Sequence, residues 1–149
     1  MFSTILNLFK KKSNKYIPVK GFSIISIKQL CKSIAIFAAE VIVSKRYYYI
    51  YKDNDYIDVI ANECIKNTKW YTNCNNSEDF AFAIHDKIQK KLEKAAFGVA
   101  LVEYPEGNHP AYKAYNFFID DKEQFNLIEF HNNRVFTKPD AWRIYFILI

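Results

Sequence analysis

The chain has 149 residues, half of them hydrophobic, and a net charge of +5. This length fits one domain with a real core, and the low Gly and Pro content excludes a disordered or low-complexity chain. The three cysteines, Cys31, Cys64 and Cys74, form no C-x-x-C pair and no zinc-like spacing with the histidines. This pattern favours free thiols in a reducing compartment, and we expect neither a metal nor another cofactor.

Charge is unevenly distributed along the chain. Residues 1–52 hold ten Lys or Arg and one acidic residue, Glu40, whereas residues 53–149 hold eleven basic and fifteen acidic residues. We therefore predict a basic N-terminal arm over residues 1–20 and a single domain over residues 21–149. Such an arm indicates docking to an anionic surface, either nucleic acid or a membrane, or to an acidic protein partner. The alternative is a charged surface that serves solubility alone.

The pattern of the N-terminal segment is not typical of a signal peptide or of a membrane-spanning helix. Met1–Phe9 is apolar and is followed by three lysines, whereas a signal peptide carries its charges first and has a longer apolar run. Nine residues are too few to cross a bilayer as a helix. We therefore expect a protein that is neither secreted nor membrane-spanning. Residues 13–21 are predicted to be an extended linker, because Pro18 disfavours helix at the residue before it.

Two helices and two strands are predicted before residue 73. Residues 23–44 begin with a helical pattern of apolar residues and end in the β-branched run Val41–Val43. Residues 47–51 contain four tyrosines, which favour a strand. Residues 59–70 form a plausible short helix with Ile60 facing inward.

The central prediction is a helix that begins near Ser77. Asn76 or Ser77 can cap its first turn, where Glu78 and Asp79 suit the positive end of the helix dipole. Lysines follow at its other end, where basic residues are favoured. One buried face is indicated by apolar residues at spacings of three and four: Phe80, Ala83, Ile84, Ile88 and Leu92.

After this helix the pattern changes to strands. Four strands are predicted, at residues 96–104, 114–119, 125–130 and 142–149, with turns at Asp120–Lys122 and Asn132–Asn133 and a loop at Pro105–Pro110. A helix followed by antiparallel strands defines an α+β domain.

Several of these segments carry a resemblance to a known family. The run Ser77–Ala83, the strand AFGVALVEY, the strand AYNFFID and the tripeptide LIE at 127–129 resemble the papain-like fold. More narrowly, they are similar to the protease-like domain of a mushroom agglutinin and to related phage-encoded proteins. The resemblance covers residues 70–135 and implies N-terminal helices followed by a four-stranded antiparallel sheet packed on a central helix. It also implies a Cys–His–Glu triad.

The chain departs from that triad at two of its three positions. Ser77 stands where the family has the nucleophilic Cys, and Lys113 stands where it has the His, while Glu129 keeps the third role. A hairpin turning about Asp121 would place Lys113 directly opposite Glu129. Such a pair is a cross-strand salt bridge, whereas a His at position 113 would be oriented by the carboxylate for catalysis.

The triad positions leave three hypotheses for function. The first is a papain-like domain without catalysis that acts as a binding or structural module; the resemblance adds a phage or virus particle as its setting, so we expect a cytoplasmic or virion-associated protein. The second is an active cysteine peptidase or amidohydrolase that uses the displaced residues Cys74 and His109 with Glu129, or with His131 on the same strand face. The third is docking to nucleic acid or membrane through the basic N-terminal third.

Overall fold

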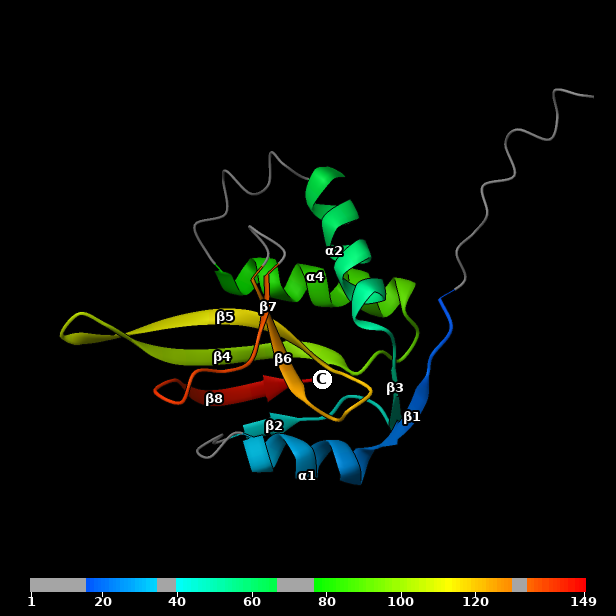
Figure 1. Cartoon of the computed structure of the whole chain (residues 1–149), viewed down its shortest axis with the longest axis horizontal. Coiled ribbons are helices and arrows are strands. Elements are labelled where there is room, and N and C mark those ends of the chain that lie inside the picture. Colours follow the sequence, from blue (N-terminus) through cyan, green and yellow to red (C-terminus); the bar gives the residue numbers. More distant parts are fainter. Residues whose placement is uncertain (1–15, 35–39, 67–76, 130–133) are drawn as a thin grey trace, which may run out of the picture.

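The computed structural model describes residues 16–34, 40–66, 77–129 and 134–149 (Figure 1). Within these ranges the chain forms three helices and eight strands. Their bounds, in chain order, are β1 Lys20–Ser23, α1 Ile24–Ile34, β2 Glu40–Ile42, β3 Tyr47–Ile50, α2 Asp53–Lys66, α4 Ser77–Lys91, β4 Phe97–Glu106, β5 His109–Ile119, β6 Phe125–Glu129, β7 Arg134–Phe136 and β8 Arg143–Leu148. No helix in the described ranges is long and apolar enough to cross a membrane.

The predicted α+β class is confirmed. The main sheet has six strands in the order β2-β8-β4-β5-β6-β7, and a separate two-stranded sheet joins β1 to β3. Helices α2 and α4 cover one face of the main sheet, and α1 covers the other (Figure 1).

The predicted four-stranded antiparallel sheet is too small. All four predicted strands form, but β2 and β7 extend the sheet, and β2 pairs with β8 in parallel. The C-terminal strand β8 does not lie beside β7, which precedes it in the sequence. It inserts between β2 and β4 instead. Local patterns do not encode which distant strands pair, so the sequence alone could not supply this order.

Helix α4 forms as predicted. It begins at Ser77, has Glu78 and Asp79 in its first turn and Lys90 and Lys91 in its last, and so matches the helix dipole at both ends. Its apolar face is buried at Phe80, Ile84 and Ile88. This face packs on β4 and β5, so the amphipathic pattern fixes which side of the helix meets the sheet.

Helix α2 begins six residues earlier than predicted. The Asp55 side chain accepts a hydrogen bond from the Lys52 amide at 3.2 Å, and the Asp55 amide donates to the Lys52 carbonyl at 2.9 Å. This pair closes the first turn in the manner of a capping box. The added turn buries Tyr56, whose ring stacks on Phe97 and Phe118.

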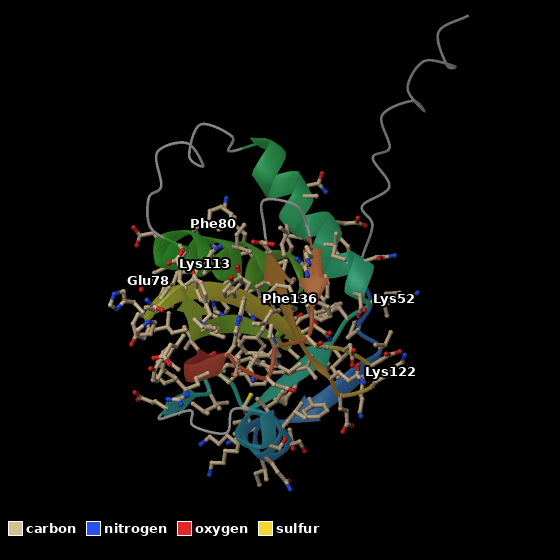
Figure 2. All side chains as sticks on the ribbon, turned by 60° about the vertical axis from the view of Figure 1, so that its left-hand side comes forward. Lys52, Glu78, Phe80, Lys113, Lys122 and Phe136 are labelled. Atoms are coloured by element: carbon tan, nitrogen blue, oxygen red, sulfur yellow. The ribbon has the colours of Figure 1, made fainter. Side chains whose placement is uncertain are left out.

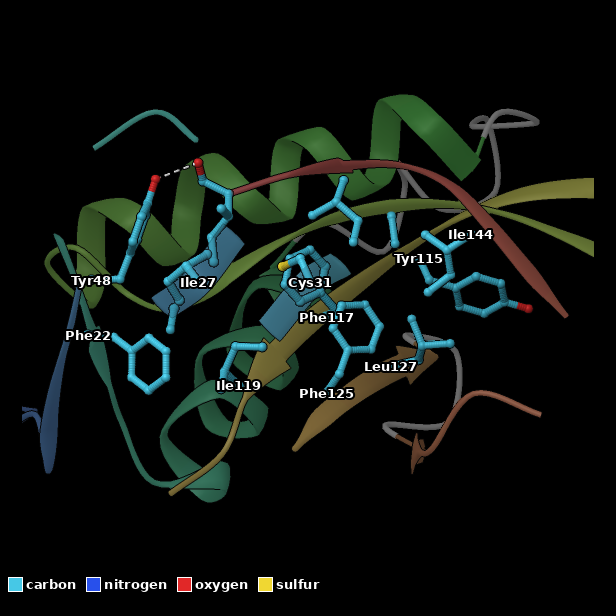
Figure 3. Close-up of a cluster of buried hydrophobic side chains, with 14 of the residues drawn as sticks. Phe22, Ile27, Cys31, Tyr48, Tyr115, Phe117, Ile119, Phe125, Leu127 and Ile144 are labelled. Atoms are coloured by element: carbon cyan, nitrogen blue, oxygen red, sulfur yellow. Dashed lines mark hydrogen bonds between the residues drawn. The ribbon is translucent and has the colours of Figure 1, made fainter. Parts of the chain in front are cut away.

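The core has two clusters, one on each face of the main sheet. The first lies under α2 and α4, and the second lies between the sheet and α1 (Figure 3). Ile27 and Cys31 of α1 are buried against Phe117 and Leu127 of the sheet. At one end of this cluster the Tyr48 hydroxyl donates to the Ile149 carbonyl at 2.7 Å, which satisfies a buried polar group. Burial raises the pKa of the Cys31 thiol to about 12, so this cysteine is part of the core and is not a nucleophile near neutral pH.

The predicted loop at 105–110 is wrong, because these residues extend two strands into a hairpin arm. The arm comprises residues 104–111, turns at Gly107 and Asn108, and reaches beyond the rest of the sheet (Figure 1). Gly107 has φ +60°, as the first central position of a two-residue II′ turn requires. Pro105 lies opposite Pro110. Neither proline has an N–H to offer a further strand, so both edges of the arm are blocked against strand pairing.

Residues 1–15 lie outside the described residues. The basic arm predicted for residues 1–20 therefore remains a prediction. Of its described part, residues 16–20, Val19 bonds its amide to the Ile50 carbonyl and Lys20 opens β1.

Candidate functional site

We call Ser77, Lys113 and Glu129 the family positions, because the resemblance aligns them with the Cys–His–Glu triad. The first of them, Ser77, lies at the N-terminus of α4, where the helix meets β5. The Ser77 hydroxyl accepts a hydrogen bond from the Ala114 amide at 3.1 Å. Ala114 lies beyond the paired part of β6, whose pairing with β5 reaches only Asn116 opposite Ile128. The serine therefore satisfies a strand N–H that β6 does not reach, and this bond anchors the start of the helix to the sheet.

The second and third family positions form an ion pair. Lys113 Nζ lies 3.9 Å from Glu129 Oε1, and each side chain is about one-quarter exposed, at 26% and 28%. The ammonium also lies 5.0 Å from the centre of the Tyr115 ring, within the range of a cation–π contact. Figure 2 shows Lys113 beside the first turn of α4, where Glu78 and Phe80 lie. Ser77, Lys113 and Glu129 thus come from three elements that meet at one end of the sheet.

The predicted register of this hairpin is wrong by two residues. Direct opposition of Lys113 and Glu129 requires a turn centred on Asp121, but Ile119 pairs with Phe125 and the turn centres on Lys122. The cause is a five-residue loop in which the Asp120 carboxylate accepts from the amides of Lys122 and Gln124. A shift of two residues keeps every side chain on its face, so Lys113 and Glu129 still approach each other, diagonally across the two strands.

This arrangement lacks the contact that nucleophilic catalysis needs. Among the described residues, the Ser77 hydroxyl bonds to the Ala114 amide and makes no hydrogen bond to Lys113, whose ammonium lies beside Glu129 instead. An ammonium is a donor only and accepts no proton. A serine hydroxyl becomes a useful nucleophile when a base lies within hydrogen-bond reach. The geometry favours an anchored helix and a surface ion pair over a reacting pair.

Of the three possible substitutes for the family residues, Cys74, His109 and His131, the structure describes only His109. His109 is exposed at the tip of the hairpin arm, where it pairs with Glu106. It belongs to β5 and not to a loop as predicted. Four residues along a strand separate it from Lys113, or about 13 Å. Cys74 and His131 lie outside the described residues.

Sequence reasoning assigned no role to Asn116, which is the most buried polar side chain near the site. Its amide nitrogen donates to the Ala81 carbonyl of α4 at 2.9 Å and to the Gly98 carbonyl of β4 at 3.1 Å. Its side-chain oxygen is buried and has no hydrogen-bond partner among the residues that the structure describes. An amide in the middle of the apolar strand Ala114–Ile119 was the available signal, because a buried polar group needs partners.

An aromatic cluster was also missed. Tyr115 contacts Trp142 and Phe136 with ring centres 5.6 and 5.8 Å apart, and Tyr104 contacts Trp142 at 5.3 Å. These residues come from β4, β5, β7 and the segment before β8, so no local pattern unites them. Tyr104, Phe136 and Trp142 remain partly exposed. Together with Lys113 they form a surface with one cation and several rings beside the family positions.

High pH is expected to destabilise the protein through Tyr115. Burial first, and then the nearby Glu129 and Tyr104, raise the pKa of its hydroxyl to about 12. A pKa raised above the unfolded value of about 10 gives stability that is complete below pH 10 and is lost as pH rises through the folded value. We would measure the free energy of unfolding by urea titration at pH 8 and at pH 12. Between these pH values the free energy of unfolding should fall less in Tyr115→Phe than in the parent. Equal losses in both proteins would contradict this assignment.

Comparison with solved structures confirms the papain-like fold, whereas comparison of the sequence with family models and curated proteins assigns no family. No protein-family model matches the sequence, and no curated protein does. Among solved structures, the PSL1a–E64 complex matches with a TM-score of 0.67 and 14% sequence identity, over 87% of this chain. The chain spans 50% of the length of that protein. At this identity the likeness shows a shared fold and carries no residue roles across.

Among the described residues, no three His, Cys, Asp or Glu side chains are grouped so that they could hold a metal ion.

Proposed function

We propose that this chain is a catalytically degenerate papain-like domain that acts as a binding or structural module. The observation that carries the proposal is the pairing at the family positions: the Ser77 hydroxyl is bonded to a backbone amide, and Lys113 is paired with Glu129. Each side chain has a structural partner in place of the partner that catalysis requires. The proposal rests on this geometry, together with the papain-like scaffold.

The surface beside these positions suits a protein partner. Lys113 lies over the buried Tyr115 ring, and the partly exposed rings of Tyr104 and Trp142 continue the same aromatic cluster. Aromatic side chains near a charged group are typical of the residues that dominate binding at protein interfaces. The ion pair orders the lysine before binding, which lowers the entropy that a partner must overcome.

A phage or virus particle is the setting that we propose for this module. Its support is the resemblance to phage-encoded relatives alone. Mass spectrometry of purified particles tests it: the chain should be found at a constant ratio to the major structural protein. Its loss on washing the particles would contradict a structural role.

The purified protein is expected to show no peptidase or amidase activity. We would treat it with a thiol-directed epoxide probe and with a serine-directed fluorophosphonate probe, and measure covalent labelling by mass spectrometry. Neither Cys74 nor Ser77 should be labelled faster than in the urea-unfolded protein, because no base contacts the Ser77 hydroxyl among the described residues.

Two variants separate this proposal from the hydrolase hypothesis. Labelling at Cys74 that disappears in His109→Ala would overturn the proposal and favour an active cysteine peptidase that uses Cys74, His109 and Glu129. The double variant Ser77→Cys with Lys113→His restores the family residues at two positions. Thiol-dependent hydrolysis by this variant, absent from the parent, is the result expected of a scaffold that has lost its chemistry.

The charge distribution favours a second candidate function, docking to an anionic surface through the N-terminal third. Every charged side chain in the described segment 16–34 is basic, and the next described segment of that third, 40–50, holds one acidic residue, Glu40, and two basic ones, Lys45 and Arg46. Binding to vesicles with anionic lipids, or to duplex DNA, should weaken steeply as salt rises from 50 to 200 mM, because surface charges are screened. If a chain without residues 1–20 binds with full affinity, the N-terminal arm does not contribute to this binding.

A further inference from the structure

A polar cluster around Gln89 joins α4 to two other parts of the chain, about three helical turns from Ser77. The Gln89 amide nitrogen donates to the Ala95 carbonyl at 3.0 Å and to the Phe97 carbonyl at 3.3 Å, where the chain leaves the helix and enters β4. Its side-chain oxygen accepts a hydrogen bond from the Lys45 ammonium at 2.6 Å. Lys45 lies between β2 and β3, so one glutamine side chain connects three segments.

The backbone at Lys45 is fixed by the buried Tyr48 hydroxyl. This hydroxyl accepts hydrogen bonds from the Ser44 and Lys45 amides at 2.9 and 2.8 Å, and it donates to the Ile149 carbonyl at 2.7 Å. A hydroxyl has one donor and two acceptor sites, so these three bonds use its whole capacity. The bond between Lys45 and Gln89 therefore links α4 to the end of the main sheet where Ile149 follows β8.

His85 lies beside this bond. It precedes Gln89 by four residues, which places both side chains on the same side of the helix. Its Nε2 atom is buried and has no hydrogen-bond partner among the described residues. Burial first, and then the nearby Lys45, lower the pKa of His85 below its ordinary value of about 6.5. The neutral imidazole is therefore the form that fits this position.

The charged groups around His85, among the described residues, come from two segments. Lys45 faces it from the segment between β2 and β3, and Asp86 faces it from α4 itself and opposes the lowering of its pKa. The Asp86 carboxylate is exposed and forms a salt bridge with the next helical turn. Burial and Lys94 lower the pKa of Lys45, whereas Glu93 raises it. A protonated His85 would thus place a second cation beside an ammonium that is already partly buried.

From these observations we propose that His85 makes the contact between α4 and residues 43–46 sensitive to acid: its protonation repels the Lys45 ammonium, breaks the bond to Gln89 and loosens this segment. Because the pKa of His85 is lowered in the closed form, the contact is complete above about pH 7 and weakens as pH falls through about 6.5. Acidification would also free the Lys45 ammonium for other partners. This inference does not depend on the function proposed above.

The test is hydrogen exchange of the Ser44 and Lys45 amides, measured by NMR at pH 7.5 and pH 5.5 and corrected for the intrinsic rate at each pH. In the parent, protection of both amides should fall by about threefold to tenfold, because an open form with an ordinary His85 pKa of about 6.5 gains at most about tenfold at pH 5.5. In His85→Gln, which takes up no proton in this range, protection should change by less than about 1.5-fold. His109→Gln is the matched control at an exposed histidine and should behave like the parent.

A second measurement keeps the test decisive if His85→Gln does not fold. The imidazole chemical shift of His85 should titrate with a midpoint below about 6.5 in the parent. The midpoint should rise in Lys45→Met, which keeps an unbranched side chain and removes the charge, while the midpoint of His109 stays the same. The proposal is overturned if protection in the parent does not change with pH, if His85→Gln loses as much protection as the parent, or if Lys45→Met leaves the His85 midpoint unchanged.

Discussion

Replacing Gly98 by alanine is expected to destabilise the protein by at least about 3 kcal/mol, the upper end of the usual cost of adding a methyl group to a packed core. A β-carbon at this position would lie 2.1 Å from the Leu148 carbonyl oxygen and 2.5 Å from the Phe117 ring. Rotation of a side chain cannot relieve the first of these contacts, because the oxygen belongs to the backbone of β8. The strands themselves would have to separate.

The measurement is urea unfolding followed by circular dichroism, with Gly21→Ala as the matched control. Both glycines lie in strands, but at Gly21 the nearest atom to a new β-carbon is 3.8 Å away, on the Tyr49 ring. The control should change the free energy of unfolding by less than about 0.5 kcal/mol. Similar losses in the two variants would mean that β4 and β8 are not packed as closely as described.

The second large effect is expected from Asn116→Ala, with a loss of about 2–3 kcal/mol for two buried hydrogen bonds and the space left by the amide. The side chain is fully buried and links α4 to β4 through the carbonyls of Ala81 and Gly98. Asn116→Asp should cost more at neutral pH, because a carboxylate has no proton to donate to these carbonyls and would be buried with a charge.

Asn62→Ala is the control for this experiment. Asn62 also donates its side-chain amide to a backbone carbonyl, that of Asp58 at 2.8 Å, but it does so within one helix and at the surface. Its replacement should change stability by less than about 0.5 kcal/mol. If Asn116→Ala were equally mild, the amide would not join the helix to the sheet, and the position would be open to other roles.

A stable link between α4 and the sheet matters for function, since it holds the start of the helix against β5. Ser77 and Asn116 tie α4 to the sheet at two points: the Ser77 hydroxyl bonds the Ala114 amide, and the Asn116 amide bonds the Ala81 carbonyl. In an active relative of this fold, the nucleophile would need the same placement. Here the scaffold is kept while Lys113 is paired with Glu129, which is why we propose a binding or structural role for this domain.

The sequence by itself determined the elements whose signals are local. The spacing of Phe80, Ile84 and Ile88 and the acidic first turn predicted a helix that starts within one residue of Ser77, because helix periodicity and capping depend on neighbours a few positions apart. The tyrosine-rich strand β3 and the four main strands followed from residue type in the same way. The assignment of Ser77, Lys113 and Glu129 to the triad positions remains a prediction from the resemblance of short ordered motifs.

Tertiary structure decided the features that depend on distant residues. The parallel pairing of β2 with β8 and the insertion of β8 beside β4 join segments about 40 to 100 residues apart, and no local pattern encodes such pairing. The hairpin register shifted by two residues because the Asp120 carboxylate holds a five-residue loop. The Tyr49 peptide groups bond to the Lys94 and Ala96 peptides, so Gly21, the partner of Tyr49 across the strand pair, directs its own peptide groups away from β3. Contacts between distant segments therefore decided which strands pair and which way their peptide groups point.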